Sequence, residues 1–347
     1  MRMLKPALAA LVVVIMAAPA MAQVPRTRDG KPDLTGNWTN ASVTPLTRAP
    51  TIKTLVVGEE EAKRIASGYA VGGIKEEGYK TNYSDPNKGA PPKGGKDFGI
   101  QAYDSFWWDP GTSLALVKGE YRTSYVVDPP SGQLPFVDPV GQEKARLANR
   151  ERYDTGNAAY EGPEDPTLGE RCIVSFGRNG GPPMLNNGFY NNNYNIVQGK
   201  DTVAIWVEMV HDVRTIRIGG KHRTDGVRPW FGDSIGHYEG DTLVVETTNI
   251  PQAQAYAGSW QTLTVTEKFK KVSPTRLYYS YTIHDPVAWD ADWGGEYEFD
   301  ALPKGQHVYE YACHEGNYAM ENMLAGARAE DEAARTRAAN SPATQAR

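Results

Sequence analysis

Long apolar runs and clusters of basic residues are both scarce in this chain of 347 residues. A membrane-spanning helix needs about 20 successive apolar residues, and no segment beyond residue 22 reaches that length. The formal net charge is −5 and the sequence pI is about 5.8. An acidic chain without a basic cluster is poorly suited to nucleic acid or an anionic membrane surface. We therefore expect no nucleic-acid partner, no integral membrane segment, and a small molecule as ligand or substrate.

Motifs for the common cofactors are also lacking. The chain has no P-loop, no GxGxxG before a helix, no GxSxG and no kinase signature. Its six histidines form no HExxH or HxH pattern and no ligand cluster with the cysteines. We expect chemistry without a cofactor and without a metal ion. A metal site assembled from distant strands is the alternative that this pattern leaves open.

The first 22 residues have the features of a secretory signal peptide. Arg2 and Lys5 precede an apolar run over residues 7–15, and Ala20-Met21-Ala22 supplies the small residues of a cleavage site. No cysteine directly follows that site, since the next residue is Gln23, which argues against a lipoprotein anchor. The sequence predicts export to the periplasm.

Only two cysteines are present, Cys172 and Cys313. Two thiols in an oxidising compartment most simply pair, and the chain contains no CxxC pattern. We expect a disulfide bond between them. A reactive thiol or a metal ligand is the functional alternative.

Glycine, proline and tyrosine are abundant, at 35, 24 and 19 residues, which favours turns and aromatic strands over a helical bundle. Successive short strands without intervening helices predict an antiparallel sheet that closes as a barrel or packs as a sandwich. Strands are expected at residues 33–38, 122–127, 171–174, 195–197, 202–210, 214–218, 242–248, 262–269, 276–283, 297–299 and 307–311. Helices are expected at residues 54–66, 141–152 and 317–337.

This pattern predicts a mainly β protein, barrel-like (of the calycin or lipocalin type) or a sandwich, with a C-terminal helix and long loops. The expected organisation is a signal peptide (1–22), a loop-rich N-terminal extension (23–120), an antiparallel β domain (121–316), and a C-terminal helix and tail (317–347). Residues 68–99 are rich in glycine, lysine and proline and are expected to form a long surface excursion.

Several ordered blocks of sequence resemble a family of exported bacterial proteins that is numerous in acidobacteria and sphingomonads. The blocks are KPDLTGNW (31–38), NNNYNI (191–196), EMVHDVR (208–214), GDTLVVETTN (240–249) and YACHEGNY (311–318). The resemblance covers nearly the whole chain beyond residue 22 and implies a Gram-negative periplasmic setting. No catalytic assignment follows from it. The triplet Gly36-Asn37-Trp38 is also similar to the GxW motif of lipocalins.

Four residues are the candidates for acid–base catalysis. His211 ends an apolar strand and would share the inward face of Val207 and Met209, while Asp212 would face the other way. His211 would take a proton, Arg214 would hold the developing anion, and His314 or Glu315 would return a proton. The alternative for His211 is a core histidine bonded to the backbone. For the segment around His314 it is a helix cap formed by Asn317.

A second group of side chains is suited to holding a polar or aromatic substrate. Asp233 and His237 are expected in a loop at the barrel mouth, and paired tryptophans stack against rings. Asparagine runs, however, also favour turns, and paired tryptophans also close the end of a core. The predicted substrate-binding residues are Asn192, Tyr194, Asp233, His237, Trp289, Trp293 and Tyr318.

The favoured function is a cofactor-independent acid–base enzyme in the periplasm. It would act as a lyase, isomerase or hydratase on a small aromatic or cyclic molecule in the barrel, with a plant-derived phenolic as one concrete example. The first alternative is a non-catalytic periplasmic protein that binds a small molecule. The second is a metal-dependent hydrolase.

Overall fold

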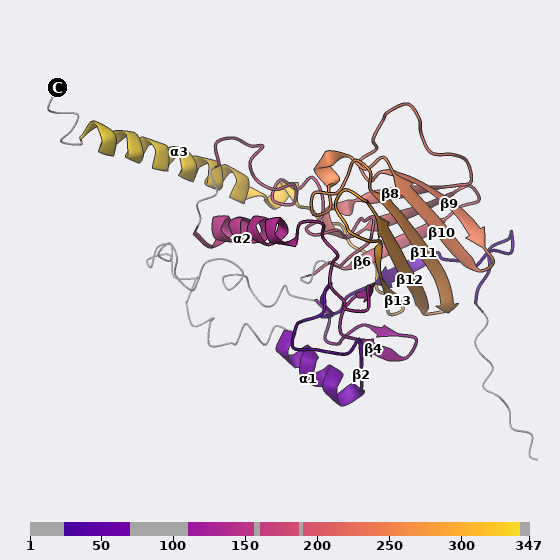
Figure 1. Ribbon diagram of the computed structural model, residues 1–347. Helices are drawn as coiled ribbons and strands as arrows, with labels where there is room; N and C mark the ends of the chain where they lie inside the picture. The colour runs from indigo at the N-terminus through magenta and orange to yellow at the C-terminus, as the bar shows by residue number, and fades with distance from the viewer. Residues whose placement is uncertain (1–23, 70–109, 156–159, 187–189, 341–347) are drawn as a thin grey trace, which may run out of the picture.

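The computed structural model describes residues 24–69, 110–155, 160–186 and 190–340 (Figure 1). The predicted signal peptide and nearly all of the predicted surface excursion at 68–99 lie outside these residues. No helix in the described ranges has the length and apolar character needed to cross a membrane.

The centre of the molecule is a closed barrel of nine strands, counted over the described residues (Figure 1). Strand β1 pairs with β6 on one side and β13 on the other, which closes the sheet. Neighbouring strands run antiparallel, except that β8 and β9 are parallel. The strands are β1 (Gly36–Thr39), β6 (Asn193–Gln198), β7 (Thr202–Val207), β8 (Val213–Ile218), β9 (Asp233–Glu239), β10 (Thr242–Thr248), β11 (Thr264–Ser273), β12 (Arg276–His284) and β13 (Trp293–Ala301). The predicted mainly β, barrel-like fold is confirmed.

Alternation along the strands explains which side chains fill the barrel. On β12 the buried residues are Leu277, Tyr279, Tyr281 and Ile283, with more exposed residues between them. Tyr281 lies opposite Gly295 of β13. A Cβ atom at Gly295 would lie 2.4 Å from the Tyr281 phenol oxygen, so the ring fits only because this position is glycine.

Smaller elements surround the barrel. Strand β5 (Val126–Asp128) adds to β13, and β2 (Val56–Val57), β4 (Glu120–Arg122) and β3 (Leu116–Val117) form a separate small sheet. Helix α1 (Glu59–Tyr69) has its buried face in a second apolar cluster with Leu114. Helices α2 (Pro139–Thr155) and α3 (Tyr318–Ala339) complete the described chain, and α3 extends away from the barrel (Figure 1).

The small sheet is joined to the outer wall of the barrel by charge. Arg122 of β4 lies 3.0 Å from Glu296 of β13. Arg276 of β12 pairs with Glu298 at 2.8 Å and also donates to the carbonyl of Leu116 of β3 at 2.6 Å. Tyr278 also donates a hydrogen bond to Glu296, at 2.7 Å. The carboxylates on the outer face of β13 are therefore used for assembly of the fold.

The structure departs most from the predicted strands at four places. Residues 171–174 form turns in which Cys172 has φ of +56°, and residues 307–311 are not in a strand. The strand expected at 202–210 ends at Val207, because a 3-10 turn (Met209–His211) follows it. The strand expected at 122–127 is divided between β4 and β5.

The segment expected to form a loop at the barrel mouth is strand β9. Its outward positions carry Asp233, His237 and Glu239, and two of its inward positions carry the small residues Ser234 and Gly236. The segment therefore lacks the apolar alternation that marks a strand in sequence. Strand β1 also comes from the predicted N-terminal extension, so the barrel uses strands from both sides of residue 120.

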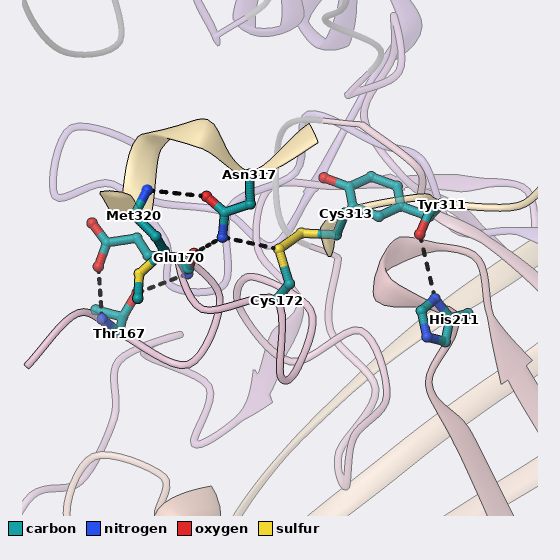
Figure 2. The surroundings of a disulfide bond; sticks show 8 residues. All are labelled: Thr167, Glu170, Cys172, His211, Tyr311, Cys313, Asn317 and Met320. Atoms are coloured by element: carbon teal, nitrogen blue, oxygen red, sulfur yellow. Dashed lines mark hydrogen bonds between the residues drawn. A yellow bond between two sulfur atoms is a disulfide. The ribbon is translucent and has the colours of Figure 1, made fainter. Parts of the chain in front are cut away.

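The predicted disulfide bond is confirmed. Cys172 and Cys313 are bonded, with their Cα atoms 5.7 Å apart and a sequence separation of 141. The bond ties the loop before the barrel's second strand to the segment that leads into α3 (Figure 2). In the chain-entropy model a loop of this length is worth roughly 5 kcal/mol to stability.

Candidate functional site: the polar end of the barrel

The two ends of the barrel differ in chemistry. One end, named here the closed end, is filled by Leu34 and Trp38, both almost fully buried. The Trp38 indole N–H donates to the carbonyl of Leu34 at 3.0 Å. Lys271 covers the Trp38 ring at 5.1 Å and donates to the carbonyl of Asp33 at 2.7 Å. Buried apolar groups with satisfied polar atoms make this end a structural plug.

The other end, where β12 ends and β13 begins, is named here the polar end. Beneath it a buried ion pair joins β8 to β11, because Arg214 donates two hydrogen bonds to Glu267. Tyr279 donates to the same carboxylate at 2.7 Å, and Thr247 accepts from Arg214 at 3.1 Å. Burial opposes the charge on Arg214, but Glu267 outweighs burial and raises the Arg214 pKa. Arg214 therefore keeps its charge in the barrel interior.

Four aromatic rings lie together at the polar end. The Trp293 ring is 5.4 Å from Trp289, 5.8 Å from Tyr256 and 5.9 Å from Tyr281. The guanidinium of Arg178 lies 4.9 Å from the centre of the Tyr256 ring. We call these five residues the aromatic cluster.

The aromatic cluster carries buried hydrogen-bond donors without acceptors among the described residues. They are the Tyr281 hydroxyl, the indole N–H groups of Trp289 and Trp293, and Nε of Arg178; Nε2 of neighbouring Gln254 is a further one. A buried donor without an acceptor costs about 1–3 kcal/mol. Side chains that offer flat apolar faces and donors together are suited to a ring that bears oxygen atoms.

A loop covers this end and is bonded to the barrel. Within it, the N–H of Met184 donates to Tyr279 at 2.9 Å, and the Met184 carbonyl accepts from Tyr297 at 2.7 Å. Ser175 in the same loop donates its N–H to the carboxylate of Asp212 at 3.0 Å. The disulfide at Cys172 fixes the start of this loop.

Asp212 is the ionisable group at the rim of the polar end. It lies two residues before Arg214 and, like Arg214, is buried. Burial raises the pKa of Asp212 to about 6, against the hydrogen bonds from Ser175 and the nearby His211 side chain, which lower it. A carboxyl group with this pKa exchanges its proton close to neutral pH.

Five of the residues predicted from sequence lie at the polar end. Arg214, Trp289 and Trp293 are described above. Tyr194 is fully buried at the start of β6, with its ring 5.3 Å from Phe299. Asn192 is buried beside it and accepts from the amide of Asn179 at 3.1 Å.

The expectation that His211 faces the barrel interior is wrong. His211 is exposed, and its Nδ1 lies 3.3 Å from the carbonyl oxygen of Tyr311 (Figure 2). The 3-10 turn before it, with φ of +58° at Val210 and +49° at His211, breaks the alternation of β7. Asp212 therefore takes the buried position that the continuous strand would have given to His211.

The C-terminal candidates are also placed outside the barrel. His314, Glu315 and Tyr318 are exposed, and Tyr318 is 73% accessible. Asn317 caps α3 by accepting the N–H of Met320 at 3.3 Å, and its amide donates to the Glu170 carbonyl at 2.8 Å (Figure 2). Asn317 is therefore the N-cap of α3, which was the structural alternative to a catalytic role for this segment. A surface cavity of about 720 Å³ lies beside it, lined by the disulfide, Glu170 and Asn317 among others.

Asp233 and His237 lie on the outer face of β9 and do not line the barrel mouth. Asp233 accepts from Arg217 and from the Arg223 N–H, both at 2.7 Å. His237 lies 3.2 Å from Glu239 and is exposed. The pair was expected in a loop, and formation of β9 turned both side chains outward.

Sequence reasoning missed Glu267, Tyr279, Arg178 and, as an inward residue, Asp212. One signal for Glu267 was present, because it is a carboxylate between Val265 and Phe269 on the apolar face of β11. Arg178 gave no such signal, since its partners come from a distant loop.

Among the described residues, no three histidine, cysteine or carboxylate side chains gather as a metal site. No protein-family model matches this chain, and no curated protein or solved structure is similar to it. The likeness of its sequence blocks to exported acidobacterial and sphingomonad proteins stays a prediction.

Proposed function

We propose that the protein binds a small aromatic or cyclic molecule with oxygen substituents at the polar end of its barrel. The observation that carries this proposal is the aromatic cluster, in which Tyr281, Trp289 and Trp293 are buried yet keep donors without an acceptor. A ring that stacks among these side chains and accepts their hydrogen bonds would satisfy those donors.

The test is a binding screen that uses tryptophan fluorescence, because two of the indoles belong to the cluster. The panel contains 4-hydroxybenzoate, vanillin, cyclohexanecarboxylate and their amides or alcohols. We expect quenching or a spectral shift that saturates, and that is reduced in Trp293→Phe and Trp289→Phe. Trp230→Phe, in an exposed part of the loop before β9, is the matched control and keeps the affinity. Failure of every panel member to bind would contradict the proposal.

Acid–base catalysis on the bound molecule is the second candidate function, of the lyase, isomerase or hydratase type. It is favoured by Asp212, whose pKa of about 6 suits proton exchange and whose carboxylate lies under the loop at the polar end. In this function Asp212 replaces His211 as the proton acceptor, while Arg214 holds Glu267 and Tyr279 in place.

Turnover of a bound panel member, followed by mass spectrometry, separates the two functions. An enzyme loses turnover in Asp212→Asn while it keeps ligand affinity, and its rate rises with pH through about 6. A binding protein leaves the ligand unchanged with either aspartate or asparagine at this position. His211→Ala is the matched control, because this side chain lies outside the barrel.

We also propose that the protein is exported to the periplasm after removal of residues 1–22. The Cys172–Cys313 bond supports this location, because disulfides persist in oxidising compartments. A native mass spectrum of periplasmic protein is expected to give the mass of residues 23–347 less two hydrogens. A mass that includes the first 22 residues would contradict the proposal.

A further inference from the structure

Arg178 is a half-buried cation that has no carboxylate partner among the described residues. One of its outer nitrogens donates to the carbonyl of Gln254 at 3.0 Å, and the other donates to the carbonyl of Pro182. Its Nε is buried and has no acceptor among the described residues. Burial lowers the pKa of Arg178 to about 10, which leaves the side chain charged at neutral pH.

Glu267, a buried carboxylate whose charge acts on Arg178, already has other partners. Glu267 accepts two hydrogen bonds from Arg214 and a third from Tyr279. Glu267 is thus committed to Arg214 and Tyr279, and no salt bridge joins Arg178 to a carboxylate among the described residues. A buried charge without a partner is costly, and buried charges in proteins are normally paired.

Three other arginines on or beside the barrel wall show the usual arrangement. Arg122 pairs with Glu296, Arg276 with Glu298, and Arg217 with Asp233. Arg228 and Arg48 differ from these. Arg228 donates to the carbonyls of Ile250 and Gln261, and Arg48 donates to the carbonyl of Pro130 and has unpartnered nitrogens. Arg48, however, packs on the turn at Gly132 and contacts no ring of the aromatic cluster.

We infer that Arg178 binds a carboxylate of the ligand, so that the molecule held at the polar end is an aromatic or cyclic carboxylic acid. Nε–H and a neighbouring outer N–H form the fork that matches the two oxygens of a carboxylate. The ring of the ligand then lies among Tyr256, Trp289 and Trp293, which are continuous with Arg178. This inference rests on the proposed binding function and further specifies that the ligand is an anion.

The experiment compares acids with their neutral amides of the same shape. 4-Hydroxybenzoate and 4-hydroxybenzamide, and cyclohexanecarboxylate and its amide, are titrated at pH 7 into the full-length exported protein by calorimetry. We expect each acid to bind at least about tenfold more tightly than its amide, as a charge-assisted pair supplies. Arg178→Gln should abolish that difference and leave the affinity for the amide within about twofold.

Two further variants test whether the position and the planar shape of the cation matter. Arg48→Gln removes a buried cation outside the cluster and should preserve the preference for the acid. Arg178→Lys keeps the charge without the fork and should give an intermediate preference. Thermal unfolding of each variant shows that it is folded.

The two levels of the proposal fail in different ways. Equal binding of acid and amide, or an unchanged preference in Arg178→Gln, overturns the role of Arg178 while ligand binding stands. Binding of neutral panel members alone overturns it in the same way. Failure of every acid, amide and neutral panel member to bind overturns both this inference and the proposed function.

Discussion

Trp38 and Trp293 are both fully buried indoles on strands of the same barrel, yet the hydrogen bonding of their indole N–H groups differs. At the closed end the Trp38 N–H donates to a backbone carbonyl, and Leu34 and Lys271 cover the ring. At the polar end the Trp293 N–H has no acceptor among the described residues. The comparison teaches that one end is complete as protein structure, while the other has hydrogen-bonding capacity to offer a ligand. Four predictions test that difference.

The largest expected effect belongs to the closed end. Trp38→Ala removes a buried ring and its hydrogen bond, and should lower the free energy of unfolding by about 3–5 kcal/mol. Urea unfolding measures this loss. Trp230→Ala, at an accessible position, is the matched control and should cost far less. Equal losses in the two variants would show that the closed end is not a structural plug.

The buried ion pair should give the next largest effect. Glu267→Gln keeps an acceptor for Tyr279 but leaves Arg214 buried without an anion, which should cost about 3 kcal/mol or more. The double variant Arg214→Met with Glu267→Leu removes both charges and should be the more stable of the two. Denaturant unfolding of both variants is the measurement. A double variant as unstable as Glu267→Gln would contradict this account of the pair.

Asp212 should make stability depend on pH at the polar end. The folded chain holds its proton more tightly than the unfolded chain does, because burial raises the pKa of Asp212 to about 6. Its contribution to the free energy of unfolding should therefore fall as pH rises from about 4 to about 6, by about 1–2 kcal/mol after solvent screening.

Asp212→Asn keeps an oxygen for the Ser175 N–H and should remove this fall, as followed by thermal unfolding across pH. Asp233→Asn is the control, because the pKa of Asp233 is shifted in the opposite direction. Burial would raise the Asp233 pKa, but the Arg223 N–H and the Arg217 side chain outweigh burial and lower it. Loss of the Asp233 carboxylate in Asp233→Asn should therefore lower the free energy of unfolding above about pH 4. The same pH profile in wild type and Asp212→Asn would refute the assignment.

The smallest effect on stability is expected at the aromatic cluster. Trp293→Phe and Trp38→Phe remove the same ring volume, but the Trp293 N–H bonds to nothing in the described protein, so the loss of unfolding free energy should be smaller in Trp293→Phe by about 1 kcal/mol. Trp38→Phe loses a made hydrogen bond and should be the less stable of the pair. Calorimetric unfolding compares the two variants. A larger loss of unfolding free energy in Trp293→Phe than in Trp38→Phe would contradict the difference between the two ends of the barrel.

The fold was largely predictable because most strands carry a clear alternation and clear turns. Leu277, Tyr279, Tyr281 and Ile283 alternate with more polar residues on β12, and the expected strand matches the observed one within a residue. Strand β9 was missed because its outward positions hold acidic residues and a histidine, and two of its inward positions hold only Ser234 and Gly236. Hydrophobic periodicity does not detect a strand of that composition.

The site was predictable only in part, for a local and a long-range reason. Locally, one turn at Val210 changed which residue faces the interior, so the right segment was chosen and His211 was placed where Asp212 lies. At long range, Arg178 meets Tyr256 through a loop that no local pattern positions. Trp289 and Trp293 were found because paired aromatic residues near a strand end are visible in sequence.

The most direct test of the account is an NMR titration of protein with ¹⁵N-labelled tryptophan, in which each indole N–H is assigned by its Trp→Phe variant. On addition of 4-hydroxybenzoate, the account predicts that the Trp289 and Trp293 resonances shift and saturate together, while the Trp38 resonance stays in place. A shift at Trp38 as large as that at Trp293, or no shift at either cluster indole, would contradict the assignment of the polar end as the ligand site.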